Sequence, residues 1–313
     1  MQRASGDVSL TRGAGASQPN PTQRNATQRN DASPSAAPRR APRRVLRASQ
    51  SPCRLDAPQA GVKGGPPRVI KPVLPKIYVY DHCPFCVRVR LALGLKNVKH
   101  EAVFMANDDV ATPTALLGKK IAPIYEQTDV GLVMGESMDI IAKFDADPSY
   151  GQPGFFQPAS GREDIKAWMK SVKDMLRLLH RPRYMKAALP EFQQRDSRDY
   201  FVKGHPVPPF DKPEWKPDDA MTMEQRWGHF KAAYEQTDAL LPELNAKLAE
   251  LEGMIANEWY CTDGGLSYDD IDLWARLRSV TLVRGAQFGP KTQAYLQNLS
   301  AAGDIPLYFN MAC

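Results

Sequence analysis

Three features are scarce in this 313-residue chain, and each narrows what it can be. No segment approaches 18 consecutive apolar residues, so the sequence predicts no membrane-spanning helix. The five cysteines are odd in number and mostly scattered, unlike the dense pairs of a small secreted disulfide scaffold. Residues 1–75 lack aromatic side chains and so have little from which to build a core. We therefore expect a protein without a membrane span, in a reducing or redox-buffered compartment.

Charge is distributed unevenly along the chain. Of the 41 Lys and Arg residues, 13 lie in residues 1–75 and 28 in the remainder, whereas the 35 Asp and Glu residues divide into 3 and 32. The first segment therefore carries a net charge of +10 and the remainder −4. Because the remainder is mildly acidic, we expect no nucleic-acid binding by the folded part.

Residues 1–75 form a basic leader with 11 prolines. Such a segment cannot bury enough apolar surface to offset the entropy of ordering, so we predict that it is disordered. Its richness in Arg, Ser and Ala and its lack of acids are similar to a transit peptide for a plastid or mitochondrion. A solvated basic tail on a cytoplasmic protein is the alternative. No apolar run follows Met1, which argues against a secretory signal.

The most informative pattern is the tetrapeptide Cys83-Pro84-Phe85-Cys86, which lies between a strand pattern and a helix pattern. Residues 76–80 are β-branched and aromatic and predict a buried strand. From Pro84 onward, apolar residues recur at helical spacing, and proline suits the first turn of a helix. Cys83 is therefore expected at a helix N-terminus, among free backbone N–H groups and the positive end of the dipole.

This placement predicts a reactive thiol. A helix N-terminus favours the thiolate, and in such motifs the pKa falls from about 8.5 to between roughly 3.5 and 7.5. Cys86 lies one turn further along, so we expect Cys83 to attack a disulfide and Cys86 to displace the bound group. Two other interpretations stay open: half of a zinc site, which would need further ligands, or two inert buried cysteines.

The segments after this motif predict a small α/β domain over residues 76–147. Residues 98–104 predict a second strand, and the helical crossover implies parallel pairing with the first. Residues 112–118 predict a short helix capped by Thr112. Further strands are expected at residues 121–125, interrupted by Pro123, and at residues 131–134, followed by a helix over residues 136–144. This order predicts a thioredoxin-like fold.

Beyond a Pro- and Gly-rich linker at residues 148–162, the pattern predicts an all-helical domain over residues 163–313. One helix is expected at residues 165–180, a shorter one at residues 191–202, and a long one at residues 227–251 with a kink or break at Pro242. Residues 204–217 predict a loop outside the core. Ser267 and Asp270 predict a capping box at the start of a later core helix.

Several charged side chains receive no role from the sequence. Arg88 and Arg90 are expected to be solvated residues of their helix. His180, His205 and His229 show no spacing typical of metal ligands, so we assign them no chemistry.

A family resemblance rests on five segments of the first domain: residues 78–86 (YVYDHCPFC), 94–97 (GLKN), 107–109 (NDD), 112–114 (TPT) and 136–140 (ESMDI). Together they resemble the glutaredoxin 2 family, two-domain glutaredoxins with a glutathione S-transferase-like architecture. The resemblance extends over residues 76–313 and weakens within the second domain. The leader and an insertion near residues 204–218 depart from the family pattern.

The resemblance implies a role for each cysteine and for the segment around a proline. Cys83 would be the nucleophile that carries glutathione, and Cys86 the resolving cysteine. Pro123 would be a cis-proline that faces the active site, and the backbone of Ala122 would pair with the cysteinyl group of glutathione. By its position alone, Pro123 fits a trans residue of an edge strand equally well.

The resemblance also implies that Glu136 and Ser137 hold the γ-glutamyl end of glutathione. A helix N-terminus with a hydroxyl group suits a carboxylate, and Glu136 could bind the ammonium group. Without the resemblance, Ser137 fits a simple helix cap and Glu136 a surface charge. Phe85, which we also place against glutathione, stands where the family often has Tyr, so one hydroxyl group is missing there.

The implied activity is that of a glutathione-dependent thiol–disulfide oxidoreductase that reduces protein–glutathione mixed disulfides and small disulfides. Glutathione would be the co-substrate, with no metal or flavin. The expected partners are glutathione and glutathionylated or disulfide-containing proteins, and the chain is expected to be a monomer. The alternatives are a glutathione transferase or dehydroascorbate reductase, in which a Cys-x-x-Cys motif would be superfluous, and a non-enzymatic glutathione or iron–sulfur scaffold.

Overall fold

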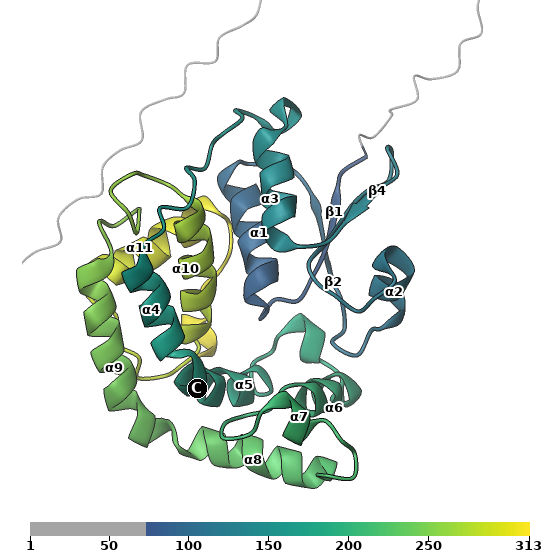
Figure 1. Cartoon of the computed structure of the whole chain (residues 1–313), viewed down its shortest axis with the longest axis vertical. Helices are drawn as coiled ribbons and strands as arrows, with labels where there is room; N and C mark the ends of the chain where they lie inside the picture. The colour runs from purple at the N-terminus through teal and green to yellow at the C-terminus, as the bar shows by residue number, and fades with distance from the viewer. Residues whose placement is uncertain (1–72) are drawn as a thin grey trace, which may run out of the picture. The chain divides into compact units, whose positions relative to one another are not determined.

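The computed structural model describes residues 73–313, which belong to one compact unit (Figure 1). The predictions of a disordered leader and a transit peptide therefore fall almost entirely outside the described residues. Among residues 73–313, no helix is both long enough and apolar enough to cross a bilayer.

The first part of the described chain is thioredoxin-like. Its elements are β1 (Lys76–Val79), α1 (Pro84–Leu95), β2 (Glu101–Phe104), α2 (Ala111–Leu117), β3 (Ile124–Gln127), β4 (Leu132–Met134) and α3 (Ser137–Ala146). The sheet has the order β2-β1-β3-β4, and β1 pairs with β2 in parallel, as the crossover predicts. The pairings of β1 with β3 and of β3 with β4 are antiparallel. Helices α1 and α3 pack together on one side of the sheet, and α2 lies on the other (Figure 1).

Two local predictions in this part are wrong. Thr112 does not cap α2, which begins at Ala111; instead the Asp109 carboxylate accepts a hydrogen bond from the Thr112 N–H at 2.9 Å. The third strand begins at Ile124 rather than at residue 121. Proline has no N–H to donate to a neighbouring strand, so the ladder starts only after Pro123.

The second part is a helical bundle. Its elements are η1 (Pro148–Tyr150), α4 (Glu163–Ser171), α5 (Lys173–Tyr184), η2 (Pro190–Phe192), α6 (Arg195–Gly204), α7 (Lys212–Trp215), α8 (Met223–Glu235), α9 (Thr237–Met254), α10 (Tyr268–Val280), α11 (Pro290–Ala302) and η3 (Phe309–Met311). The predicted capping box at the start of α10 is confirmed, since the Ser267 N–H donates to the Asp270 carboxylate at 2.8 Å.

Two helix boundaries differ from the predictions. The helix expected over residues 165–180 is two helices, α4 and α5, that meet at Val172. The long helix does not break at Pro242, which lies inside α9; the break falls between α8 and α9, at Gln236. There the Thr237 hydroxyl donates to the Tyr234 carbonyl at 2.5 Å, and Arg183 donates to the same hydroxyl oxygen at 2.9 Å. A tertiary contact, rather than proline, therefore sets this boundary.

The segment predicted as a loop outside the core, residues 204–217, contributes to the core instead. Trp215 in α7 is completely buried, packs near Phe210 and Phe230, and donates its indole N–H to the Val202 carbonyl at 2.7 Å. Arg226 donates to the Trp215 carbonyl at 2.9 Å. Burial of so large an aromatic group outweighs the loop-forming composition around it.

The two parts share one hydrophobic core, in which α1 packs against α10 and α11 of the bundle. Gly94 of α1 and Gly303, just after α11, meet so closely that a Cβ atom on Gly94 would lie 2.0 Å from the Gly303 carbonyl oxygen. Only glycine fits at position 94. Figure 1 shows α1 held between α3 on one side and α10 on the other.

Candidate active site

Cys83 lies where the sequence predicts it, at the start of α1. It is the N-cap residue, with an extended backbone (φ −73°, ψ 117°), and Pro84 is the first residue of the helix. The Cys83 side chain is half-buried, whereas Cys86 is completely buried and accepts a hydrogen bond from the Tyr80 N–H at 3.4 Å. One sulfur can therefore be reached from outside and the other lies beneath it.

The two thiols differ sharply in acidity. The pKa of Cys83 is lowered to about 7, first by a hydrogen bond with the Cys86 thiol and then, against the effect of burial, by the charge of His82 and the backbone N–H groups of Cys86 and Phe85. The pKa of Cys86 is raised well above its usual value, mainly by burial. Near neutral pH, Cys83 is thus partly a thiolate while Cys86 keeps its proton. An attacking and a resolving cysteine require this difference.

His82, next to Cys83, contacts the helical part, and the sequence analysis missed this contact. Its Nδ1 lies 2.6 Å from Oε1 of Glu191, and its backbone N–H donates to the same oxygen at 2.8 Å. Glu191 belongs to η2 and is completely buried. Burial opposes its ionisation, but the hydrogen bonds from His82 hold the pKa of Glu191 below its usual value. The carboxylate therefore fixes His82 beside Cys83.

Three aromatic rings of the helical part surround the same histidine. The rings of Tyr184, Phe192 and Phe201 have centroids 4.9, 4.9 and 5.1 Å from that of His82. Their packing leaves the imidazole few orientations. No sequence spacing predicts this arrangement, because Tyr184, the pair Glu191 and Phe192, and Phe201 come from α5, η2 and α6, far along the chain from His82.

Asp81, one residue earlier, anchors the same loop in a buried network. Arg278 of α10 donates to both carboxylate oxygens at 3.1 Å, the Tyr308 hydroxyl donates at 2.7 Å, and Arg90 donates at 2.5 Å. Burial works against ionisation, but these donors lower the pKa of Asp81. The expectation that Arg90 is solvated is wrong, because its guanidinium forms an ion pair with Asp81 and its side chain is mostly buried.

Arg88 is also buried rather than solvated, which corrects the second expectation about α1. Its Nε donates to the Asp272 carboxylate of α10 at 2.9 Å, and its Nη1 donates to the Ser137 hydroxyl at 3.4 Å. The guanidinium lies 4.8 Å from the centroid of the Phe85 ring. An arginine of α1 thus joins α10 to the start of α3.

Comparison with known proteins assigns both parts to related families. Residues 77–153 match the model of the glutathione S-transferase N-terminal domain, and residues 164–312 match that of the glutaredoxin 2 C-terminal domain. Glutaredoxin 2 of Escherichia coli K12 is 33% identical over 240 residues, which cover 76% of this chain and 99% of that protein. The chain belongs to the glutaredoxin 2 family.

A solved structure from the glutaredoxin 2 family agrees with this assignment. Glutaredoxin 2 of Salmonella typhimurium, in complex with glutathione, shares 32% identity and superposes with a TM-score of 0.65. The match covers 76% of this chain and 99% of the other. The helical part is therefore glutathione S-transferase-like, as the resemblance implies.

The residues that the glutaredoxin 2 resemblance assigns to glutathione fall into two groups. Cys83, Phe85 and Ala122 line one cavity, and the Ala122–Pro123 peptide bond is cis, with Pro123 buried. Among the described residues, neither Glu136 nor Ser137 lines that cavity. The start of α3, where Ser137 accepts a hydrogen bond from Arg88, therefore forms a separate flank of the site.

The start of α3 differs from a simple Ser cap. Glu136 is the N-cap residue, exposed, with φ 63°, and no side chain caps the helix. Ser137 is the first residue of α3 and is buried. The interpretation of Ser137 as the cap is therefore wrong, and its hydroxyl is held by Arg88 instead.

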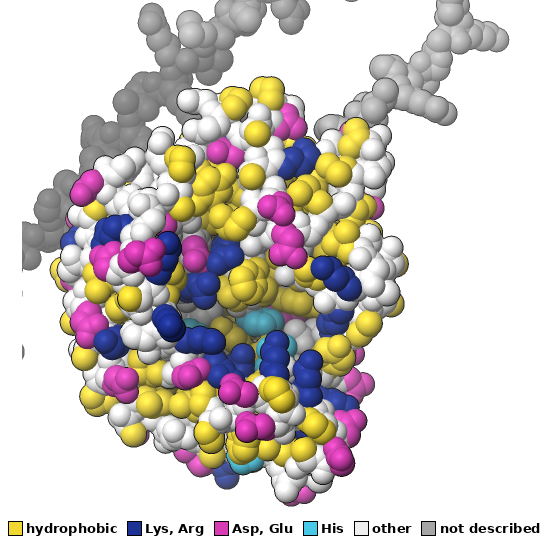
Figure 2. Space-filling view, in the orientation of Figure 1, with side chains coloured by type: hydrophobic (Ala, Val, Ile, Leu, Met, Phe, Trp, Pro, Cys, Tyr) yellow, Lys and Arg dark blue, Asp and Glu magenta, His cyan; other side chains and the backbone are white. Residues whose placement is uncertain are grey.

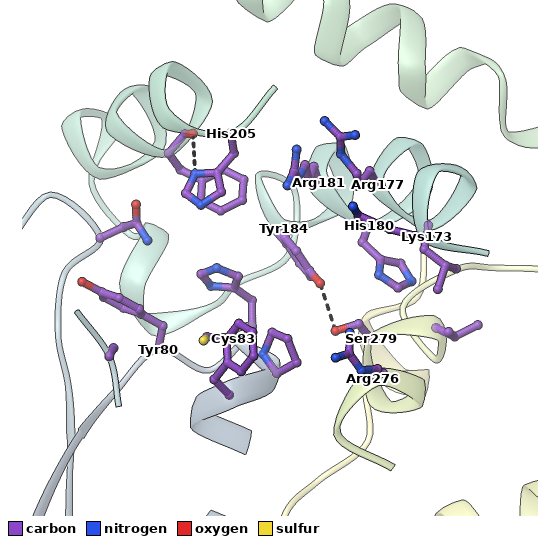
Figure 3. Close-up of a pocket in the computed structure, with 18 of the residues that line it drawn as sticks. Tyr80, Cys83, Lys173, Arg177, His180, Arg181, Tyr184, His205, Arg276 and Ser279 are labelled. Atoms are coloured by element: carbon purple, nitrogen blue, oxygen red, sulfur yellow. Dashed lines mark hydrogen bonds between the residues drawn. The ribbon is translucent and has the colours of Figure 1, made fainter. Parts of the chain in front are cut away.

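The cavity beside Cys83 has a volume of about 630 Å³ and receives side chains from both parts of the molecule (Figure 3). The loop before α1 supplies Tyr80 and Cys83, α5 supplies His180 and Tyr184, and His205 follows α6. His180 and His205, to which the sequence analysis assigned no role, therefore face the same space as the nucleophile. No group of three or more His, Cys, Asp or Glu side chains in residues 73–313 is arranged to hold a metal ion.

Proposed function

We propose that this chain is a glutathione-dependent thiol–disulfide oxidoreductase that reduces mixed disulfides between glutathione and proteins, and small disulfides. The observation that carries the proposal is the pair of unlike thiols: an accessible Cys83 with its pKa lowered to about 7 above a buried Cys86 with a raised pKa. Membership of the glutaredoxin 2 family and the glutathione complex of the Salmonella relative support it.

The reaction begins when the Cys83 thiolate attacks the glutathione sulfur of a mixed disulfide. A bond forms between Cys83 and glutathione, and the other thiol leaves and takes up a proton. A second glutathione, as thiolate, then attacks the glutathione sulfur held on Cys83. This step releases oxidised glutathione and restores the Cys83 thiolate.

Cys86 supports a second route for disulfides that react with both cysteines. After Cys83 has formed a mixed disulfide, Cys86 loses its proton and attacks the Cys83 sulfur. The bound group leaves as a thiol, and a Cys83–Cys86 disulfide remains for two glutathione molecules to reduce. Burial and the charge of the Cys83 thiolate both raise the pKa of Cys86. Once Cys83 has formed a mixed disulfide, it no longer carries that charge, and Cys86 loses its proton more readily.

The flank formed by α3 would bind the γ-glutamyl end of glutathione. Ser137 brings a hydroxyl group and a helix N-terminus, Glu136 brings a carboxylate for the ammonium group, and Arg88 orients the hydroxyl. The backbone of Ala122 and the ring of Phe85 would complete the site near the sulfur. These assignments follow the family resemblance and the positions described above.

Replacement of Cys83 by Ser tests the proposal directly. We expect turnover of a glutathionylated peptide to fall by more than about 10³-fold, because a hydroxyl at neutral pH does not replace the thiolate. Cys313→Ser is the matched control, since this residue does not line the cavity and its replacement should leave the rate unchanged. Retained turnover in Cys83→Ser would overturn the proposal.

We also propose that residues 1–75 direct the protein to a plastid or mitochondrion, in line with their basic composition. A fluorescent reporter fused behind residues 1–75 should reach one of these organelles. A reporter that stays diffuse in the cytoplasm would reject the proposal.

A further inference from the structure

The cavity that begins at Cys83 carries charge of one sign. Five cations line it, and no Asp or Glu does so among the described residues; the cations are Lys120, Lys173, Arg177, Arg181 and Arg276. Figure 2 shows Lys and Arg side chains gathered around the hollow at the centre of this face, with histidine in its depth. A cleft lined by one sign of charge attracts ligands of the opposite sign.

Three of these cations come from a single face of α5. Lys173, Arg177 and Arg181 follow one another at intervals of four residues, so they lie on the same side of the helix. Arg177 has an acidic neighbour, Asp174, at 2.9 Å. Arg181 instead donates to the Pro206 carbonyl, and within the described residues it forms no ion pair. Burial lowers the pKa of Arg181 to about 10, so the guanidinium is still charged at neutral pH.

His180 adds an unsatisfied polar atom to the same wall. The side chain is buried, and its Nε2 has no hydrogen-bond partner among the described residues. Burial lowers the pKa of His180 to about 3, so the ring is neutral and can donate a single N–H. A buried polar atom without a partner destabilises the protein, and a ligand that accepts this hydrogen bond would remove that penalty.

The remaining wall is apolar, with Trp168, Met169 and Leu176 among its residues. The volume of about 630 Å³ lies within the usual range for small-molecule sites, roughly 300–1,000 Å³. An apolar wall next to a cationic rim suits a compact ligand that has an apolar body and an anionic end.

We propose that this cavity binds the non-glutathione half of a mixed disulfide when that half is a small apolar group carrying a carboxylate. The inference rests on the proposed function, because the disulfide must lie against Cys83 while glutathione occupies the flank formed by α3. When Cys83 attacks the glutathione sulfur, a bond forms between Cys83 and glutathione, and the small group leaves as a thiolate that takes up a proton from solvent. The cations of α5 bind its carboxylate throughout, and His180 donates to it.

Two mixed disulfides of glutathione test the preference, one with 4-(mercaptomethyl)benzoate and the other with 4-(mercaptomethyl)benzamide. The methylene group separates the substituent from the sulfur, so the two leaving thiols have similar acidity. We expect kcat/KM to be about tenfold higher for the benzoate, in line with a charge-assisted hydrogen bond. Turnover of the amide reports the proposed function alone.

Variants locate the preference within the cavity. Arg181→Gln and the exposed Lys173→Gln should each lower the ratio of kcat/KM for the benzoate to kcat/KM for the amide at least about threefold. Lys173→Gln keeps the test valid if Arg181→Gln does not fold. The matched control is Lys231→Gln on α8, an exposed lysine paired at 3.8 Å with Glu235, which should leave the preference intact.

A binding measurement separates this inference from the proposed chemistry. Glutathione thioethers that carry 4-carboxybenzyl or 4-carbamoylbenzyl groups cannot be reduced, and calorimetry can compare their affinities for the unmodified protein. A carboxylate preference here supports the inference even if neither disulfide is turned over, a result that would reject the proposed function. Equal affinity for the two thioethers together with equal turnover of the two disulfides would overturn the inference and leave the proposed function standing.

Discussion

The thioredoxin-like part and the helical part contribute different things to the same site. The first supplies both sulfurs of the motif, at the N-cap and in the first turn of α1. The second supplies side chains that fix this loop and the start of α1: Glu191 contacts His82, Arg278 donates to Asp81, and Asp272 accepts from Arg88. The helical part therefore fixes the loop on which Cys83 lies, whereas the groups that lower the pKa of Cys83 are local to the motif.

The largest effect is expected inside the thioredoxin-like part. The Cys86→Ser variant should reduce a small disulfide that requires both cysteines at least about 10²-fold more slowly, because the resolving sulfur is gone. Its turnover of a glutathionylated peptide should be unchanged, since that reaction needs Cys83 alone. Parallel assays of the two substrates measure this difference. Cys86→Ala is the matched variant: it also removes the hydrogen bond that lowers the pKa of Cys83, so the thiol should titrate at higher pH than in Cys86→Ser. Equal loss with both substrates would contradict the assigned roles.

The next prediction concerns the ion pair between Arg278 of the helical part and Asp81. Arg278→Gln leaves a buried carboxylate with fewer donors, and we expect the free energy of unfolding to fall by about 3–5 kcal/mol. Denaturant titration of the folded protein gives this value. Arg276→Gln, on the same helix but half-exposed, should cost well under half as much.

The same network predicts a dependence of stability on pH. Asp81 has a lowered pKa in the folded protein, so its contribution is complete above the unfolded value of about 4 and is lost as the pH falls through the folded value. Between pH 7 and pH 3, Arg278→Gln should therefore lose less stability than the unaltered protein. Parallel curves would show that Asp81 is not responsible.

A smaller effect tests whether the helical part tunes the nucleophile. Glu191→Gln weakens the contact that fixes His82 beside Cys83, and the charge of His82 lowers the pKa of Cys83, so this pKa should rise and alkylation of Cys83 by iodoacetamide at pH 6.5 should slow by about threefold or more. Mass spectrometry of the Cys83 peptide across a pH series follows the change. Addition of Glu191→Gln to His82→Gln should produce no further shift, because the effect passes through the imidazole. An unchanged profile in Glu191→Gln would contradict this route.

The smallest effect is expected on the flank formed by α3. Ser137→Ala removes one hydroxyl group from the predicted γ-glutamyl site, so KM for glutathione should rise about three- to tenfold with little change in kcat. Steady-state kinetics at fixed disulfide concentration give both values. Ser149→Ala, at an exposed position near the end of α3, is the control. A fall in kcat alone would show that Ser137 acts on the chemical step instead.

The sequence predicted those features that depend on neighbouring residues. The strand, proline and apolar spacing around Cys83 were enough to place it at a helix N-terminus, and Ser267 with Asp270 was enough to predict a helix start. The break at Gln236 and the buried Trp215 were missed, because tertiary contacts override local composition there. The partners of His82 and Arg88 could not be predicted, since they lie 109 and 184 residues away and nothing in their spacing signals the contact.

The meeting of Gly94 with Gly303 has a consequence for how a substrate reaches the sulfur. Backbones in direct contact cannot slide past each other, so a hinge between the sheet and the bundle is closed off at this point. Substrates then reach Cys83 through the existing cavity, two of whose lining residues, Phe85 and Tyr200, are exposed. A bulkier residue at position 94 would force apart the backbones of α1 and of the segment after α11, and with them the core that the two parts share.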